Sequence, residues 1–313
     1  MDIDIELGAV LAALAAATPP EPLPVGDWKS RRAVMNTVYR ELEAASVRVD
    51  GVDSADLTVP SGDGHQVPVR LFRVPGSLPT ALLVYLHGGG MIAGSVDVYD
   101  QVCRRYAVDA GVAVLAVDYR LAPEFPFPAP LEDCVAAVEW ALRHVAEMNL
   151  PGRRVALMGD SAGGGLAAAT ALACREQGIG PLAAQLLVYP MLDDRTTSAH
   201  PAAAPFLTWT PGDNITGWQA LLGDARGAEE VPGTAVPARV RSLHGLPRTY
   251  IEVGQLDLFL DESVAYATRL IQHDIPVHLV VRPGLVHGYD RLAPASKAAQ
   301  AAHADRVAFL RSL

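Results

Sequence analysis

The stretch RRVALMGDSAGGGLAAATALA, residues 153–173, contains the change of local structure that decides the fold. Its apolar run at 154–159 is followed at once by Asp160, Ser161 and glycines, and then by an alanine-rich segment typical of a helix. Serine is a favoured N-cap residue, so Ser161 could simply cap that helix. The spacing glycine-x-serine-x-glycine also occurs where a tight strand-to-helix turn exposes a serine oxygen as a nucleophile. The presence of suitable partner residues elsewhere in the chain is needed to distinguish these two interpretations.

Short apolar runs elsewhere in the chain alternate with helical patterns. The further runs with the length of strands are 57–59, 67–72, 81–87, 112–119, 185–190, 248–253 and 276–281. The later runs are continuous, which predicts strands that are covered on both faces. Helical patterns such as 131–148 and 261–274 lie between them. The alternation predicts an α/β fold with a mostly parallel eight-stranded sheet and helices on both faces.

The size and composition of the chain predict one large domain. Its 313 residues are 50% apolar and 19% charged, which is enough apolar material for a sizeable core. Two segments depart from the strand–helix alternation, namely about 1–50 and 195–235. We expect both to form a helical cap over one edge of the sheet, within a single domain spanning 1–313.

Charge and cysteine usage exclude several classes of protein. A formal net charge of -10 without a run of lysine or arginine argues against a nucleic-acid partner. Cys103, Cys134 and Cys174 lie far apart without a C-x-x-C spacing, which argues against structural zinc or a redox pair and is typical of buried thiols in a reducing compartment.

The N-terminus does not have the pattern of a targeting segment. Its apolar run at 8–17 follows acidic rather than basic residues, unlike a signal peptide. No run approaches the roughly 20 apolar residues of a membrane span. These features predict a cytoplasmic protein without a membrane span.

A nucleophilic serine needs a base within hydrogen-bond reach and an acid that orients the base. Because ligands in open α/β sheets collect at the carboxyl ends of the strands, we expect both partners directly after strands. His287 lies in the loop directly after the last apolar run, and Asp257 lies in the loop after the run before it, whereas Asp261 has the position of a helix-start residue. The order Ser161, Asp257, His287 predicts a catalytic triad of the α/β-hydrolase type.

A glycine triplet supplies the third element of this chemistry. HGGG at 87–90 ends an apolar run, upstream of the serine turn. Attack on a carbonyl places negative charge on its oxygen, which preorganised N–H donors stabilise, and glycines let the backbone approach closely. We predict an oxyanion hole made by the amides of Gly88, Gly89 and Ala162, the last at a helix N-terminus. A merely flexible turn is the alternative interpretation of the triplet.

These motifs, together with DYRLAPE at 118–124, DLFLDE at 257–262 and HGYD at 287–290, resemble in order those of the hormone-sensitive-lipase-like family of α/β-hydrolases, the bacterial family IV esterases. The resemblance spans roughly 80–290. It implies a serine carboxylesterase that needs no cofactor, acts on a small-molecule ester and carries a helical cap built partly from its N-terminal segment. Independently of the resemblance, we expect that the protein can form a homodimer.

The chain departs from the family pattern at two positions. Leu258 stands where the family often has proline, and this change is expected to leave Asp257 in place as the acid. Met91 follows the glycine triplet where a bulky aromatic is common, so we expect Met91 to shape the acyl pocket.

Other prominent side chains have competing interpretations. Arg120 and Glu124 follow a strand, so we expect them to anchor a loop rather than to react. The aromatic residues of the second cap segment could line a substrate cavity or form the cap's own core, and we expect a mixture of both; they are Phe206, Trp209 and Trp218.

The predicted function is hydrolysis of carboxylic esters through an acyl-enzyme, and the family resemblance implies short- to medium-chain esters. Two alternatives remain open at this point. The same groups could act on amides, lactones or carbamates, or the fold could serve as a non-catalytic receptor for a small molecule, because a fold alone does not determine function.

Overall fold

The computed structural model describes residues 2–17, 22–148, 150 and 152–313. Within these ranges the centre of the molecule is an eight-stranded sheet with the order β1-β2-β4-β3-β5-β6-β7-β8. The strands are β1 (Asp53–Pro60), β2 (Gln66–Arg73), β3 (Leu82–Leu86), β4 (Ala113–Val117), β5 (Val155–Asp160), β6 (Ala184–Val188), β7 (Thr249–Gly254) and β8 (Val277–Arg282). The β1–β2 and β2–β4 pairs are antiparallel, and the other neighbours are parallel. The predicted mostly parallel sheet is confirmed.

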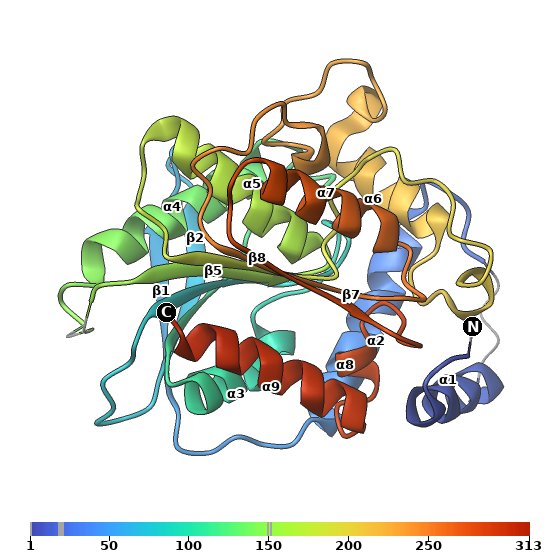
Figure 1. Cartoon of the computed structure of the whole chain (residues 1–313), viewed down its shortest axis with the longest axis horizontal. Coiled ribbons are helices and arrows are strands. Elements are labelled where there is room, and N and C mark those ends of the chain that lie inside the picture. Colours follow the sequence, from blue (N-terminus) through green and yellow to red (C-terminus); the bar gives the residue numbers. More distant parts are fainter. Residues whose placement is uncertain (1, 18–21, 149, 151) are drawn as a thin grey trace.

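Helices cover both faces of this sheet (Figure 1). They are α1 (Ile5–Ala17), α2 (Trp28–Ala45), α3 (Asp100–Ala110), α4 (Ala129–His144), α5 (Ala162–Gln177), α6 (Pro211–Leu222), α7 (Leu260–Gln272), α8 (Tyr289–Leu292) and α9 (Lys297–Arg311). Short 3₁₀ turns lie at Asp97–Tyr99, Ala204–Phe206, Gly223–Ala225 and Pro237–Arg239. In Figure 1, α3 and α9 lie below the sheet, and α4, α5 and α7 lie above it.

The two faces of the sheet contribute to two apolar clusters. In β3, Val84 packs into the cluster with α4, α5 and α7, and the next residue, Tyr85, packs into the cluster with α3 and α9. Every residue of β3, β4 and β5 is buried. The central strands are therefore continuous apolar runs because both of their faces contact helices.

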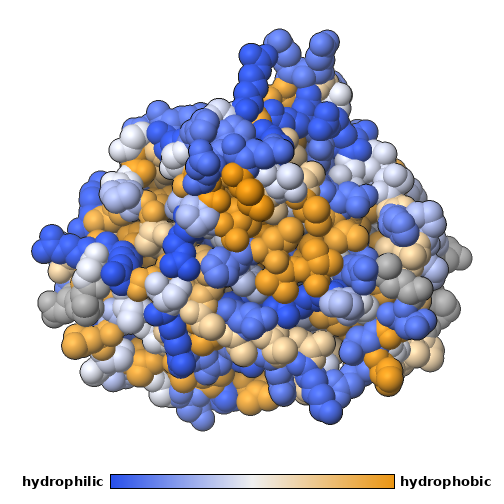
Figure 2. All heavy atoms as spheres, in the orientation of Figure 1, coloured by the Kyte–Doolittle hydropathy of each residue, from blue (hydrophilic) through white to orange (hydrophobic). Residues whose placement is uncertain are grey.

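The outermost parallel strand, β8, is less covered than its apolar sequence predicts. Leu279 and Val281 are each 37% exposed, and only β7 pairs with β8. Figure 2 shows apolar side chains on this face, over α7 and β8. The expectation that this run is covered on both faces is wrong, because β8 is an edge strand and each of its residues is at least partly exposed.

The segments that depart from the strand–helix alternation lie at the carboxyl ends of the parallel strands. Helix α2 contacts α6, and Arg31 Nε lies 2.6 Å from Asp213 Oδ1 across that contact. Helix α1 packs beside α8, where the Asp4 amide donates to the Gly284 carbonyl at 2.9 Å. Residues 1 and 18–21 of the predicted cap lie outside the described residues. Among the described helices, no stretch combines the length and apolar character that crossing a bilayer requires.

Candidate active site

Ser161 lies in the turn between β5 and α5, in an uncommon backbone conformation. Its φ is 56° and its ψ is -121°, a strained region for a residue with a Cβ. A Cβ at Gly163 would lie 2.0 Å from the Leu86 carbonyl oxygen, and one at Gly159 would lie 2.1 Å from the Gly163 carbonyl oxygen. Glycine is therefore sterically required on both sides of the serine. Ser161 precedes α5, but its side chain makes no capping hydrogen bond, so the helix-cap interpretation is wrong.

Three side chains from three loops form one hydrogen-bonded line. His287 Nε2 lies 2.8 Å from Ser161 Oγ, and His287 Nδ1 lies 2.9 Å from Asp257 Oδ2. The Asp257 side chain is fully buried, and its other oxygen accepts a hydrogen bond from the Phe259 amide at 2.9 Å. An ionised carboxylate only accepts hydrogen bonds, so Nδ1 donates and Nε2 is left to accept the serine proton. The arrangement provides a base next to a hydroxyl.

Two aromatic side chains fix the orientation of the imidazole. The rings of Phe259 and Tyr189 meet the His287 ring edge-on, with centroid distances of 5.0 and 4.8 Å. The Tyr189 hydroxyl donates to Asp290 Oδ1 at 2.7 Å, in the short helix α8 that follows the histidine loop. Edge-to-face contacts of this kind restrict ring rotation.

A buried ionic network holds α8 against β7 and α9. Arg306 Nη2 lies 2.6 Å from Glu252 Oε1, and Arg306 Nη1 lies 2.7 Å from Asp290 Oδ2. The Tyr289 hydroxyl donates to Glu252 Oε1. Burial opposes the ionisation of Glu252 and Asp290, but nearby arginine charges, that of Arg306 foremost, and hydrogen bonds together outweigh it, so the pKa of each carboxyl lies below its ordinary value. The sequence carries no local signal for this network, because its members are joined only by the fold.

Asp261 lies in the first turn of α7, as expected of a helix-start residue. The neighbouring Glu262 is buried instead of facing solvent. Its Oε1 accepts the Leu192 amide at 2.6 Å, and its Oε2 accepts the Thr196 hydroxyl. Burial raises the pKa of Glu262 to about 8. Glu262 therefore anchors the loop that follows β6, a role that the sequence does not reveal.

The first glycine of the triplet does not present a free amide. The Gly88 amide donates to the Tyr99 hydroxyl at 3.1 Å, and that hydroxyl donates to Asp160 Oδ2 at 2.7 Å. The prediction that Gly88 contributes to an oxyanion hole is therefore wrong. The sequence does not indicate that Tyr99 and Asp160 bond to each other and to the triplet, because these contacts arise only from tertiary structure.

The next two glycines have backbone conformations that favour glycine. Gly89 has φ 138° and Gly90 has φ 61°. A Cβ at Gly89 would lie 2.0 Å from the Ala93 carbonyl oxygen, and one at Gly90 would lie 2.3 Å from the Trp209 ring. Within the described ranges, no acceptor is found for the amides of Gly89 and Gly90. The Ala162 amide lies in the first turn of α5, where helix amides have no intrahelical partner.

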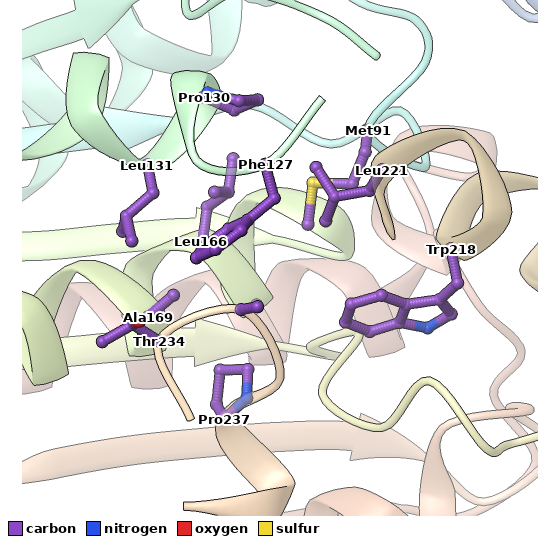
Figure 3. A pocket seen from close by; sticks show the side chains of 12 residues that line it. Met91, Phe127, Pro130, Leu131, Leu166, Ala169, Trp218, Leu221, Thr234 and Pro237 are labelled. Carbon is purple, nitrogen blue, oxygen red and sulfur yellow. The ribbon is translucent and has the colours of Figure 1, made fainter. Parts of the chain in front are cut away.

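An apolar cavity lies between α4, α5 and α6 (Figure 3). Its lining includes Met91, Phe127, Pro130, Leu131, Leu166, Ala169, Trp218, Leu221 and Pro237. The free volume is about 10 Å³, which is close to the space of a single water molecule.

The structure separates the four residues predicted to form a pocket. Met91 and Trp218 line the cavity, whereas Trp209 lies over Gly90. Phe206 is half-buried against the apolar cluster on the other face of the sheet. The sequence did not single out Phe127 and Leu166, although the first lies in a proline-rich stretch and the second lies in the helix after Ser161.

Arg120 and Glu124 have the partners expected of loop anchors. Arg120 bonds to both oxygens of the buried Asp133 and, at 2.6 Å, to Asp63. Glu124 pairs with Arg32 at 2.6 Å. In the part of the chain that the structure describes, no group of three or more His, Cys, Asp or Glu residues is arranged to hold a metal ion.

Comparison with known proteins identifies the family of the chain. The profile of a family described as alpha/beta hydrolase fold matches residues 83–291. Esterase LipI of Mycobacterium tuberculosis is 34% identical over 258 residues, which are 80% of this chain and 76% of LipI. Human hormone-sensitive lipase is 34% identical over 158 residues, 50% of this chain and 14% of the lipase. The solved structure of a bacterial heroin esterase superimposes with a TM-score of 0.88 at 33% identity, covering 99% of this chain and 97% of that one.

The fold and these matches define an α/β-hydrolase. More narrowly, the chain belongs to the hormone-sensitive-lipase-like family of esterases, the bacterial family IV. The protein is a carboxylic ester hydrolase, as its relatives are.

Proposed function

We propose that the protein hydrolyses short- to medium-chain carboxylic esters by two-step acyl transfer at Ser161, with His287 as base and acid and Asp257 as the orienting carboxylate. The observation that carries this proposal is the line of contacts from Asp257 Oδ2 through the imidazole to Ser161 Oγ, at 2.9 and 2.8 Å. Both distances are those of hydrogen bonds that can transfer or stabilise a proton.

In the first step, His287 Nε2 takes the Ser161 proton while Ser161 Oγ bonds to the ester carbonyl carbon. When the carbonyl re-forms, the bond to the alcohol oxygen breaks and His287 gives its proton to the departing alcohol. A water molecule then attacks the acyl carbon while His287 takes one of its protons. The second collapse releases the carboxylic acid and returns the proton to Ser161. Throughout, Asp257 stabilises the positively charged imidazole.

The amides of Gly89, Gly90 and Ala162 are our proposed donors to the tetrahedral oxyanion. Gly90 replaces Gly88, whose amide is already bonded to Tyr99. Donors that are fixed before the reaction stabilise the developing charge without reorganisation, and loss of one typically costs about 10²–10³ in kcat.

The proposed acyl site is the apolar cavity whose lining includes Met91, Phe127 and Leu131. Its small free volume favours short acyl groups, and longer chains require side chains such as Phe127 to move. The proposed cap is made by the described parts of 1–50 and 195–235, of which α2 and α6 contact each other and Trp209 contacts the glycine turn.

Steady-state hydrolysis of p-nitrophenyl esters from acetate to palmitate tests this function. We expect Ser161-dependent turnover that declines toward long chains, and labelling of Ser161 by a fluorophosphonate. Ser161→Ala should lower kcat by about 10⁶, whereas near-normal turnover in that variant would refute the mechanism. A matched anilide should react far more slowly than the ester, and the opposite ranking would indicate an amidase.

Two aspartates form a matched pair for the assignment of the acid. Asp257→Asn should reduce kcat by about 10⁴, because the imidazole then loses its orienting charge. Asp261→Asn, four residues along and at the start of α7, should remain within about twofold of the wild type. The reverse result would show that Asp257 is not the acid.

A further inference from the structure

Two polar side chains of α2 bond to the backbone just after the glycine triplet. Arg32 Nε donates to the Ile92 carbonyl at 2.5 Å, and the Gly94 amide donates to Asn36 Oδ1 at 3.1 Å. Arg32 and Asn36 are four residues apart, so they lie on the same face of the helix. Their partners bracket the end of the turn that contains Gly89 and Gly90.

The Arg32 guanidinium also fixes the neighbouring segment. Its Nη2 donates to the Ala122 carbonyl at 2.8 Å, and its two Nη atoms lie 2.7 and 2.6 Å from the Glu124 carboxylate. The Ala122 amide in turn donates to the Met91 carbonyl at 2.9 Å. The glycine turn is thus held at consecutive residues, Met91 and Ile92, by contacts that converge on one arginine.

The ion pair itself contributes little, because the side chains of Arg32 and Glu124 are 23% and 45% exposed. The bond to Ile92 matters more, because Ile92 is fully buried and its carbonyl would lose a charged donor. The turn also contains Met91 at φ 66°, an uncommon conformation that persists only where its surroundings hold it.

We propose that Arg32 and Asn36 are positioning residues for the oxyanion-binding turn, so that the N-terminal helix α2 completes the active site as well as covering it. This inference rests on the proposed role of the Gly89 and Gly90 amides. A displacement of about 1 Å in a reacting or stabilising group can cost 10²-fold in rate. Anchors outside the turn therefore have a direct effect on transition-state stabilisation.

The same helix is fastened to the second cap segment. The buried Arg31 pairs with Asp213 in α6, and the Gly26 amide donates to the Thr216 hydroxyl at 3.0 Å. Trp209, just before α6, lies against Gly90. Helix α2 consequently holds both the turn and the residues that cover it.

The test compares Arg32→Met and Asn36→Leu, which keep side-chain volume and remove the polar contacts, with Arg40→Met as a matched control. Arg40 lies on the same helix and is exposed, and among the described residues its side chain bonds only to Asn36 and Thr37 of α2. The substrate is p-nitrophenyl acetate. The second probe is an alkyl trifluoromethyl ketone, to whose carbonyl carbon Ser161 Oγ adds, giving a tetrahedral oxyanion.

We expect Arg32→Met to lower kcat by about 10- to 100-fold and to weaken ketone inhibition by a similar factor, with KM within about threefold of the wild type. Asn36→Leu should lower kcat and weaken ketone inhibition by smaller factors, and Arg40→Met should leave both kcat and ketone inhibition unchanged. Arg32→Lys, which keeps one donor group, should recover part of the loss.

Unchanged kcat and ketone inhibition in both folded variants would overturn the inference. A rise in KM alone would also overturn it, because α2 would then act on substrate access. If Arg32→Met does not fold, as judged by circular dichroism, Asn36→Leu, which removes the bond to the Gly94 amide, provides the same comparison. Failure of the proposed function is distinct, because the wild type would then lack Ser161-dependent hydrolysis.

Discussion

The Gly88 amide is 3.1 Å from the Tyr99 hydroxyl and donates to it, and the same hydroxyl donates to Asp160 at 2.7 Å. Asp160 directly precedes Ser161, so this short chain of hydrogen bonds joins the glycine turn to the serine turn. Gly88, the first glycine of the triplet, therefore takes part in the contact between the two loops. A Cβ at this position would lie 2.5 Å from Asp160 Oδ2, which explains why no larger residue fits.

Tyr99→Phe should destabilise the fold and impair catalysis together. The change leaves the buried Gly88 amide and one Asp160 oxygen without a partner, which costs about 1–3 kcal/mol for each group. Urea unfolding measures the loss. Tyr85→Phe removes only one bond to Asp160 and should cost less. Equal stability of the two variants would show that the Gly88 contact contributes nothing.

Glu262→Gln should make stability less dependent on pH. The pKa of Glu262 is about 8 in the fold because of burial, against 4.5 for the ordinary side chain. Its contribution to stability is therefore complete below about pH 4.5 and is lost as pH rises through 8. We expect the wild-type Tm to fall over this window, and the Gln variant, which mimics the neutral carboxyl, to show a flatter profile. Glu147→Gln, at an exposed position, should behave like the wild type.

Arg306→Met should cause a large loss of stability. It removes the Arg306 charge from Asp290 and from Glu252, whose side chain is fully buried and then keeps Arg282 as a cationic partner. Removing one partner of a buried ion pair costs about 3–5 kcal/mol, which chemical denaturation measures readily. The double variant Arg306→Met, Glu252→Gln should recover part of the loss. A double variant less stable than Arg306→Met would contradict this account.

Phe127→Ala should shift the acyl-chain preference toward longer esters. Phe127 lines the small cavity between α4 and α6, so removing its ring creates space for additional methylenes. Each buried methylene contributes about 0.8 kcal/mol, so kcat/KM for hexanoate relative to acetate should rise about tenfold or more. Phe125→Ala, two residues away at a 45% exposed position, is the control. An unchanged ratio would place the acyl chain elsewhere.

The positions of the strands were predictable because their apolar runs are long enough to identify each one. Each of the eight runs, from 57–59 to 276–281, overlaps a strand of the sheet. The sequence could not indicate that Val277–Arg282 lies at an open edge, since strand order depends on how the chain crosses over. Leu279 is therefore more exposed than its apolar character suggests.

For the site, motif spacing identified Ser161, Asp257 and His287 as candidate catalytic residues. These side chains are in hydrogen-bond contact. Their catalytic roles are our proposal. The residues that the sequence patterns did not identify act through contacts between segments that are distant along the chain. Asn36 and Gly94 are 58 positions apart, and no local pattern marks such a pair.

The order in which the chain is made has a consequence for this architecture. His287 lies 126 residues after Ser161, and Arg306, which holds the helix behind the imidazole, lies later still. Chains are synthesised from the N-terminus, so the histidine and the arginine are among the last of these groups to be made. Ser161, Asp257 and His287 can therefore meet only after strands β7 and β8 have joined the sheet, which makes the formation of the proposed site a late step.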